Sequence, residues 1–165
     1  MWTSDLTFMM LEGVRDTLLM TLLSTFFGYL LGLPWGIVLA VTDKTGIRPN
    51  AVVYKALDVL ANILRSVPFL ILLILVMPLT RAIVGKTTGS AATIVPLTIA
   101  AAPFIGRMIE SSIKEVDHGV VEAAQSMGAD TFTIIWKVLL VEARTSILVG
   151  VTIAIGTILG YSAMA

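Results

Sequence analysis

The run TLLMTLLSTFFGYLLGLPWGIVLAVT (residues 17–42) decides the class of fold, because it contains no charged side chain. A helix needs about 20 apolar residues to cross the hydrocarbon core of a bilayer. Three further uncharged runs follow it, at residues 66–80, 87–106 and 145–165. Four such runs in one chain predict a protein whose helices span a membrane.

The composition points to the same class. Of the 165 residues, 57% are hydrophobic and 13% are charged, whereas soluble domains have about 25% charged residues. A membrane β-barrel would instead show alternating strands of about 10 residues. The short second run lengthens to residues 57–80 if it takes in the segment before it, in which Asp58, Asn62 and Arg65 would lie near the membrane surface.

We therefore expect an all-α integral membrane bundle that forms one domain over residues 1–165. Its expected spans are residues 17–42, 57–80, 87–106 and 145–165. The second would begin near Leu57, and the proline at position 68 marks a bend or a helix end.

The lysines and arginines favour one orientation in the membrane. With the N-terminus outside, eight of them reach the cytoplasmic side: Lys44, Arg48, Lys55, Arg65, Arg107, Lys114, Lys137 and Arg144. Three then lie outside: Arg15, Arg81 and Lys86. Cytoplasmic loops carry the excess of positive charge, so we expect a multi-pass protein with an external N-terminus.

The charged segment between the third and fourth spans, residues 107–144, is expected on the cytoplasmic side. Near its start, Glu110 and Glu115 lie beside Arg107 and Lys114, a mixture typical of a solvated face. We expect Arg107 to extend its side chain from the end of the third span toward water.

Residue types that support catalysis are scarce. The chain has no cysteine, which excludes disulfides and thiolate chemistry. His118 is its one histidine, and a solvated loop histidine explains it better than a metal ligand does. Gly85-Lys86-Thr87 imitates the end of a phosphate-binding loop, but Thr80 occupies the position of the first glycine. We expect no catalytic residue, no cofactor, no metal site and no nucleic-acid binding.

Gly28, Gly32 and Gly36 recur every four residues, so they share one face of the first span. Small residues at this spacing let another helix backbone approach closely. The motif is explained either by ordinary packing between helices or by an interface that moves or joins two subunits.

The segment VVEAAQSMGADTFTIIWKVLL (residues 120–140) predicts two helices joined by a glycine turn. The residues up to Met127 favour a helix, and Gly128 suits the position after a helix end, where φ is often positive. Asp130 or Thr131 can cap the second helix.

Apolar residues in the second helix recur at helical spacing: Phe132, Ile135, Trp136 and Leu139. Such a unit can dock in a groove of a second protein, with apolar anchors supplying affinity and Glu122 setting the orientation. The alternative is an amphipathic helix that lies on lipid headgroups.

The stretch EAAQSMGA (residues 122–129), with Ile135 and KVLL (137–140), resembles the EAA signature of the permease subunits of ABC importers. Three further stretches resemble the methionine-importing branch of that family: RSVPFLILL (65–73), AAPFIGRM (101–108) and GYSAM (160–164). The resemblance covers essentially the whole chain.

This resemblance implies a permease subunit of the bacterial inner membrane that forms the pathway with a second copy of itself. Two separate cytoplasmic ABC ATPases would power it, and an external solute-binding protein would deliver methionine or a related amino acid. The residues expected to couple the permease to the ATPase are Glu122, Ala123, Ala124, Gly128, Phe132 and Trp136. Those expected along the translocation pathway are Pro68, Phe69, Tyr161, Ser162 and Met164.

Two features depart from the family pattern. Val141 stands where the signature usually has proline, which leaves the entry into the last span less constrained. Permeases of this branch carry a fifth span after a glycine-rich stretch, so we expect a chain that lacks this helix after Ala165. Two alternatives stay open: an importer permease for another small solute, and a permease-like membrane protein that does not transport.

Overall fold

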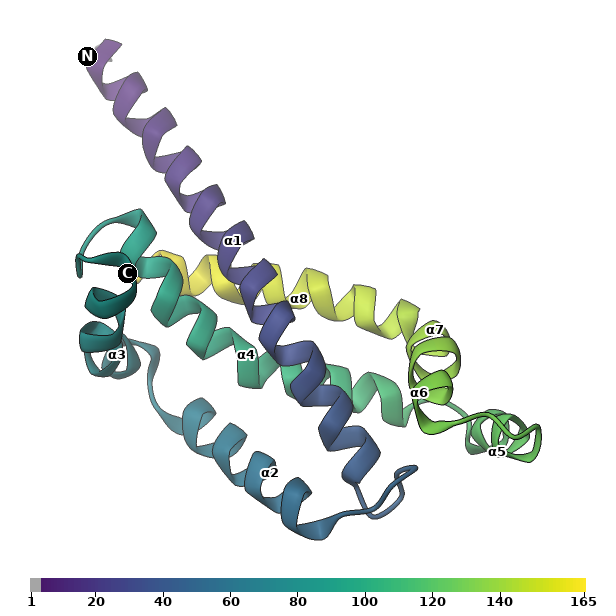
Figure 1. The fold of residues 1–165 in the computed structure, drawn as a ribbon. Coiled ribbons are helices and arrows are strands. Elements are labelled where there is room, and N and C mark those ends of the chain that lie inside the picture. The colour runs from purple at the N-terminus through teal and green to yellow at the C-terminus, as the bar shows by residue number, and fades with distance from the viewer. Residues whose placement is uncertain (1–3) are drawn as a thin grey trace.

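The computed structural model describes residues 4–165, which form helices joined by turns and loops (Figure 1). Within these residues three helices are long and apolar enough to cross a bilayer: α1 (Ser4–Thr42), α4 (Ser90–Lys114) and α8 (Arg144–Ser162). A fourth candidate span is the bent pair of α2 (Ala51–Ser66) and α3 (Phe69–Val84). The expected all-α membrane fold is confirmed, with three or four candidate spans.

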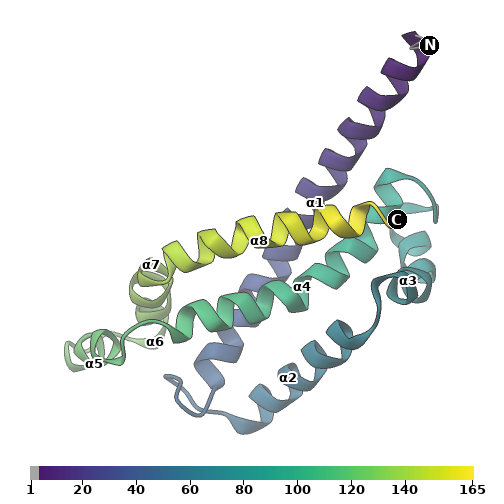
Figure 2. The same cartoon turned by 180° about the vertical axis from the view of Figure 1, so that it is seen from behind.

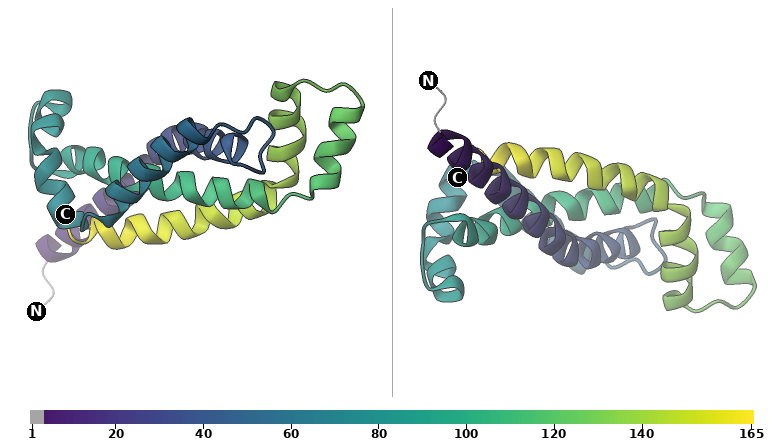
Figure 3. Two further views of the ribbon diagram at one scale, coloured as in Figure 1. Left: turned by 90° about the horizontal axis from the view of Figure 1, so that it is seen from below. Right: turned by 90° about the horizontal axis from the view of Figure 1, so that it is seen from above.

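The second span begins earlier than the expected start near Leu57, and it is broken at Pro68, where the sequence predicts a bend or a helix end. α2 begins earlier because Asn50 caps it, accepting hydrogen bonds from the backbone N–H groups of Val52 and Val53 at 3.2 Å. The chain then bends by 110° between the two helices. Val67 has the extended backbone that a residue before proline favours. α3 consequently lies across one end of the molecule (Figure 3).

α1 and α4 cross closely because glycines of α1 face α4. A Cβ atom added to Gly32 would lie 2.8 Å from the carbonyl oxygen of Ala102, and one added to Gly36 would lie 2.4 Å from that of Gly106. Gly28 faces the same helix. These distances leave no room for a methyl group, so the two backbones meet directly.

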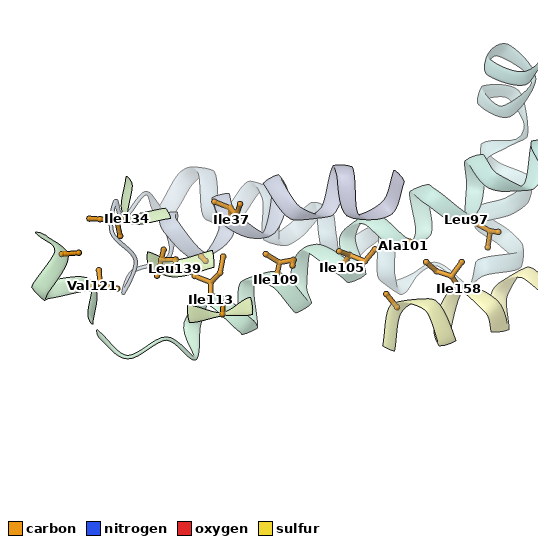
Figure 4. Close-up of a cluster of buried hydrophobic side chains, with 14 of the residues drawn as sticks. Ile37, Leu97, Ala101, Ile105, Ile109, Ile113, Val121, Ile134, Leu139 and Ile158 are labelled. Atoms are coloured by element: carbon orange, nitrogen blue, oxygen red, sulfur yellow. The ribbon is translucent and has the colours of Figure 1, made fainter. Parts of the chain in front are cut away.

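The hydrophobic core follows α4 from one end to the other (Figure 4). To this cluster the helix contributes one residue per turn: Leu97, Ala101, Ile105, Ile109 and Ile113. Residues four apart lie on one face of a helix. Ile37 of α1 and Ile158 of α8 belong to the same cluster, so α4 is the central helix of the fold.

α4 and α8 run side by side, as both Figure 2 and Figure 3 show. The C-terminal end of α8 lies near α3. The opposite end carries α5 (His118–Ser126) and the loop between α1 and α2, and these two segments line a common hollow. α4 continues beyond Gly106 to Lys114. The first residues of the charged segment 107–144 are therefore helical.

Candidate functional site

α5 is a short helix with a defined start and end. Asp117 caps its first turn by accepting a hydrogen bond from the backbone N–H of Gly119 at 2.6 Å. The helix ends at Ser126, and Gly128 has a φ of +80°. The backbone N–H of Gly128 donates a hydrogen bond to the carbonyl of Gln125 at 2.9 Å. Glycine adopts this left-handed conformation without steric cost, so the turn after α5 depends on it.

The residues of the EAA stretch lie on different faces of α5. Ala124 is 5% exposed and packs with Val121 into the core cluster. Glu122 and Ala123 are exposed. The helix is therefore held to the molecule on one side and presents Glu122 and Ala123 on its accessible side.

The chain after the turn forms a helix with a wide central turn. α6 (Thr131–Thr133) leads into the π-helical segment η1 (Ile134–Leu139), and α7 (Leu140–Glu142) follows. Asp130 precedes α6, and its carboxylate accepts a hydrogen bond from the Thr133 hydroxyl. This hydrogen bond holds the pKa of the Asp130 carboxyl below the usual value. A helical segment therefore follows the turn, as the sequence predicts.

The predicted apolar face of this second helix is wrong in one respect. We grouped Leu139 with Phe132 and Trp136, but Leu139 is 5% exposed whereas Phe132 and Trp136 are 67% and 50% exposed. In a π-helix the hydrogen bonds join residues five apart, and the two buried residues of η1, Ile134 and Leu139, have this spacing. The exposed rings of Phe132 and Trp136 have their centroids 5.9 Å apart.

α5 and the helix after it thus form an exposed surface at the end of the molecule away from α3 (Figure 1). We call it the α5 surface. Its exposed residues include the apolar Val120, Ala123, Met127, Phe132 and Trp136 and the charged Glu122, Asp130 and Lys137. It combines apolar side chains with charged ones, a composition that a groove on a second protein can recognise.

An ion network around the buried Glu110 joins α2 to α4 and corrects another expectation. Glu110, which we placed on a solvated face, is 4% exposed. Its carboxylate accepts hydrogen bonds from Arg107 at 2.7 Å, Lys114 at 2.7 Å and the Tyr54 hydroxyl at 3.0 Å. Arg107 also pairs with Asp58. Arg107, whose side chain is 20% exposed, therefore joins α2 to α4 instead of being directed only toward water.

The expected pathway residues lie at the other end of the molecule, where α3 meets α8. The rings of Phe69 and Tyr161 stack with 4.9 Å between their centroids. The Ser162 hydroxyl is directed into α8, donating to the carbonyl of Leu159 at 2.8 Å. Met164 is 59% exposed, and Pro68 precedes the first turn of α3. The structure thus brings Phe69 and Tyr161 together.

His118 lies at the start of α5, on the hollow between α5 and the α1–α2 loop. In the part of the chain that the structure describes, no group of three or more histidines and acidic residues could hold a metal ion.

A family model described as "Binding-protein-dependent transport system inner membrane component" matches residues 32–165. The chain belongs to this family. The matched range includes α5, its glycine turn and the whole of α4 and α8. The permease is therefore an inner-membrane component of a transport system that depends on a binding protein.

Curated relatives of the permease carry one kind of name. It is 50% identical over 156 residues to the "D-methionine transport system permease protein MetI" of Yersinia pestis. The alignment covers 94% of this chain and 72% of the relative. The protein of the same name from Escherichia coli K12 is 47% identical with the same coverage. The probable equivalent in Vibrio cholerae is 48% identical, covering 95% of this chain and 70% of the relative.

Solved structures agree with the fold. A chain of the MetNI methionine ABC transporter, in a structure titled as showing inward-facing conformations, matches the permease with a TM-score of 0.96 and 45% identity. This match covers 99% of the permease and 76% of that chain. An amino acid ABC transporter crystallised with histidines matches with a TM-score of 0.70 at 22% identity, again over 99% of the permease and 76% of the matched chain. The second match shows a shared fold alone.

Proposed function

We propose that the permease is the membrane subunit of an ATP-driven importer for methionine or a closely related amino acid. The observation that carries the proposal is the similarity to a chain of a methionine ABC transporter, with 45% identity and a TM-score of 0.96 over 99% of the permease. The names of the curated relatives support the same substrate.

In this proposal the α5 surface docks on a separate cytoplasmic ABC ATPase. Met127, Phe132 and Trp136 supply exposed apolar contact, and Glu122 supplies the charge that sets the orientation. The permease itself does not hydrolyse ATP. α5 then lies on the cytoplasmic side and the N-terminus outside, which agrees with the distribution of lysine and arginine.

Closure of the ATPase pair would displace α5 as a rigid body and move the attached spans. Its rigidity is supported by the Asp117 cap, the buried Val121 and Ala124, and the turn at Gly128. Because α5 follows α4 after three residues, its displacement passes to the central helix of the fold. Helices that move against one another in this way open a pathway alternately to each side.

The pathway runs between this permease and a second copy of it, with Phe69 and Tyr161 near its external end. A solute-binding protein outside the membrane delivers the amino acid to that end. The stacked rings offer an apolar contact to a methionine side chain, because sulfur interacts favourably with aromatic rings.

Affinity capture tests the docking step. The tagged permease is solubilised from its native membranes, and mass spectrometry identifies the proteins that accompany it. We expect an ABC ATPase with the wild type and its loss with Glu122→Lys. Glu115→Lys, which makes the same charge change at an exposed position next to α5, is the matched control and should retain the ATPase. A folded wild-type permease that captures no ATPase would contradict the proposal.

A further inference from the structure

A hollow of about 730 Å³ lies in the elbow between the end of α1 and the start of α2. It opens at the end of the molecule that carries α5. Charged and polar side chains line it, among them Asp43, Lys44, Lys55 and Asp58. Neither the α5 surface nor the pathway residues use it.

The acidic side chains of this hollow already have cationic partners. Asp43 pairs with Lys114, whose Nζ atom lies 3.0 Å from its Oδ2 atom, and Asp58 pairs with Arg107. Lys44 and Lys55 are exposed, and among the described residues neither has an ion pair or a side-chain hydrogen bond. Lys114 and Arg107 also pair with the buried Glu110, so this network holds three carboxylates and two cations. With Lys44 and Lys55 added, the cluster around the hollow has one net positive charge, and the two lysines are the cations that remain unpaired.

An apolar strip of α2 continues from this positive hollow. Val52, Ala56 and Val59 form a shallow groove that shares Ala51 and Lys55 with the hollow. Val52 is 80% exposed and Val59 is 45% exposed. α2 buries one residue of its own, Ala61, so this apolar face has no partner within the described chain.

We infer that the hollow and the strip together bind one anionic phospholipid. The phosphate lies between Lys44 and Lys55, and an acyl chain lies along Val52, Ala56 and Val59. Basic pockets at the membrane surface bind anionic headgroups in this way. A zwitterionic lipid brings its own ammonium group to the two lysines, which lowers its affinity.

The apolar strip distinguishes a lipid from a soluble anion. A small phosphate compound would contact the lysines but would leave the exposed valines in water. A phospholipid satisfies both, because its charged headgroup and its apolar chain are joined in one molecule. This inference requires that the permease lies in a membrane and does not depend on which solute it transports.

Native mass spectrometry tests the site. The full permease is reconstituted in nanodiscs that contain phosphatidylcholine and phosphatidylglycerol, transferred to mild detergent, and the retained lipids are counted. We expect the wild type to keep one phosphatidylglycerol in preference to phosphatidylcholine. Each substitution of Lys44→Gln or Lys55→Gln should lower the affinity about fivefold, the amount expected for one cation near an anionic surface.

Two further variants complete the design. Val52→Ser with Val59→Ser removes apolar surface without a change of charge and should also lower retention. Lys86→Gln removes one positive charge from the loop before α4, at the other end of the molecule, and should leave retention unchanged. Circular dichroism and the elution volume confirm that each variant is folded.

Equal retention of the two lipids by the wild type would overturn the inference, as would unchanged retention in a variant that carries both Lys44→Gln and Lys55→Gln. If inorganic phosphate displaces the lipid, and if the variant with both valine substitutions still retains the lipid fully, the site binds a soluble anion instead. A folded wild type that retains no lipid, while cross-linking joins α2 to a second copy, would show that protein covers this face.

Discussion

Glu110 and Arg107 lie one turn apart on α4, with the Nη1 atom of Arg107 2.7 Å from the Oε2 atom of Glu110, and together they hold α2 against the central helix. Glu110 reaches α2 through the Tyr54 hydroxyl, and Arg107 reaches it through Asp58. Since Ala61 is the one buried residue of α2, the position of this helix depends strongly on charged contacts.

Removing the charge of Glu110 should destabilise the permease. Glu110→Gln leaves Arg107 and Lys114 without their shared carboxylate at a buried position, and breaking a buried ion pair typically costs about 3 kcal/mol or more. Because the partly exposed Arg107 and Lys114 can reach water, we expect the loss of unfolding free energy to lie near the lower end of that range. Thermal unfolding in detergent measures it. Glu115→Gln, an exposed position, is the control, and an equal effect of both variants would contradict this role.

The ion pair of Asp43 predicts a dependence of stability on pH. Burial raises the pKa of Asp43, but the hydrogen bonds from Lys114 and Thr45 outweigh this effect and hold the pKa below its usual value. Because the folded-state pKa is the lower one, the contribution of Asp43 is complete above the ordinary carboxyl pKa of about 3.9 and is lost as the pH falls through the folded value. The difference in melting temperature between the wild type and Asp43→Asn should therefore shrink between pH 7 and pH 3. A constant difference would argue against the pair.

Gly36 of α1 should differ sharply from Gly156 of α8. Gly36→Ala places a methyl group 2.4 Å from the carbonyl oxygen of Gly106, and such overpacking costs about 1–3 kcal/mol. Gly156→Ala meets no atom within 4 Å and should be neutral or slightly stabilising. Thermal unfolding of the two variants decides the matter, and similar melting temperatures would show that α1 and α4 do not approach as described.

The stacked pair of Phe69 and Tyr161 should restrict the external end of the pathway. Tyr161→Ala removes an aromatic contact worth about 0.5–1.5 kcal/mol and should speed the leak of methionine from proteoliposomes in the absence of ATP. Tyr161→Phe keeps the ring and should leak at the wild-type rate. An equal leak in both variants would place the barrier elsewhere.

Local signals made much of this fold predictable. The four uncharged runs lie mainly in α1, α3, α4 and α8, because apolar length is a property of each segment by itself. The end of α5 was equally readable, since Gly128 supplies the positive φ that the turn requires. The π-helical segment was not, because its wide turn changes which residues share a face while the composition stays the same.

The contacts between distant segments were the part that the sequence did not reveal. Glu110 and Tyr54 are 56 residues apart, so a single sequence does not show that they meet. A signal was present nonetheless: Asp58 and Asn62 are spaced four apart on α2, and Arg107 and Glu110 are three apart on α4. Two pairs of polar residues of this kind, each near the end of an apolar helix, predict that the two pairs contact each other.

The number of ATP molecules hydrolysed for each methionine imported tests the central claim most directly. The permease is reconstituted with its ATPase and its binding protein, and both rates are measured for the wild type, Glu122→Lys and the control Glu115→Lys. We predict that Glu122→Lys lowers methionine uptake more than tenfold while the permease stays inserted and folded, and that any remaining hydrolysis no longer depends on methionine. Wild-type uptake and wild-type coupling in Glu122→Lys would contradict the role of α5.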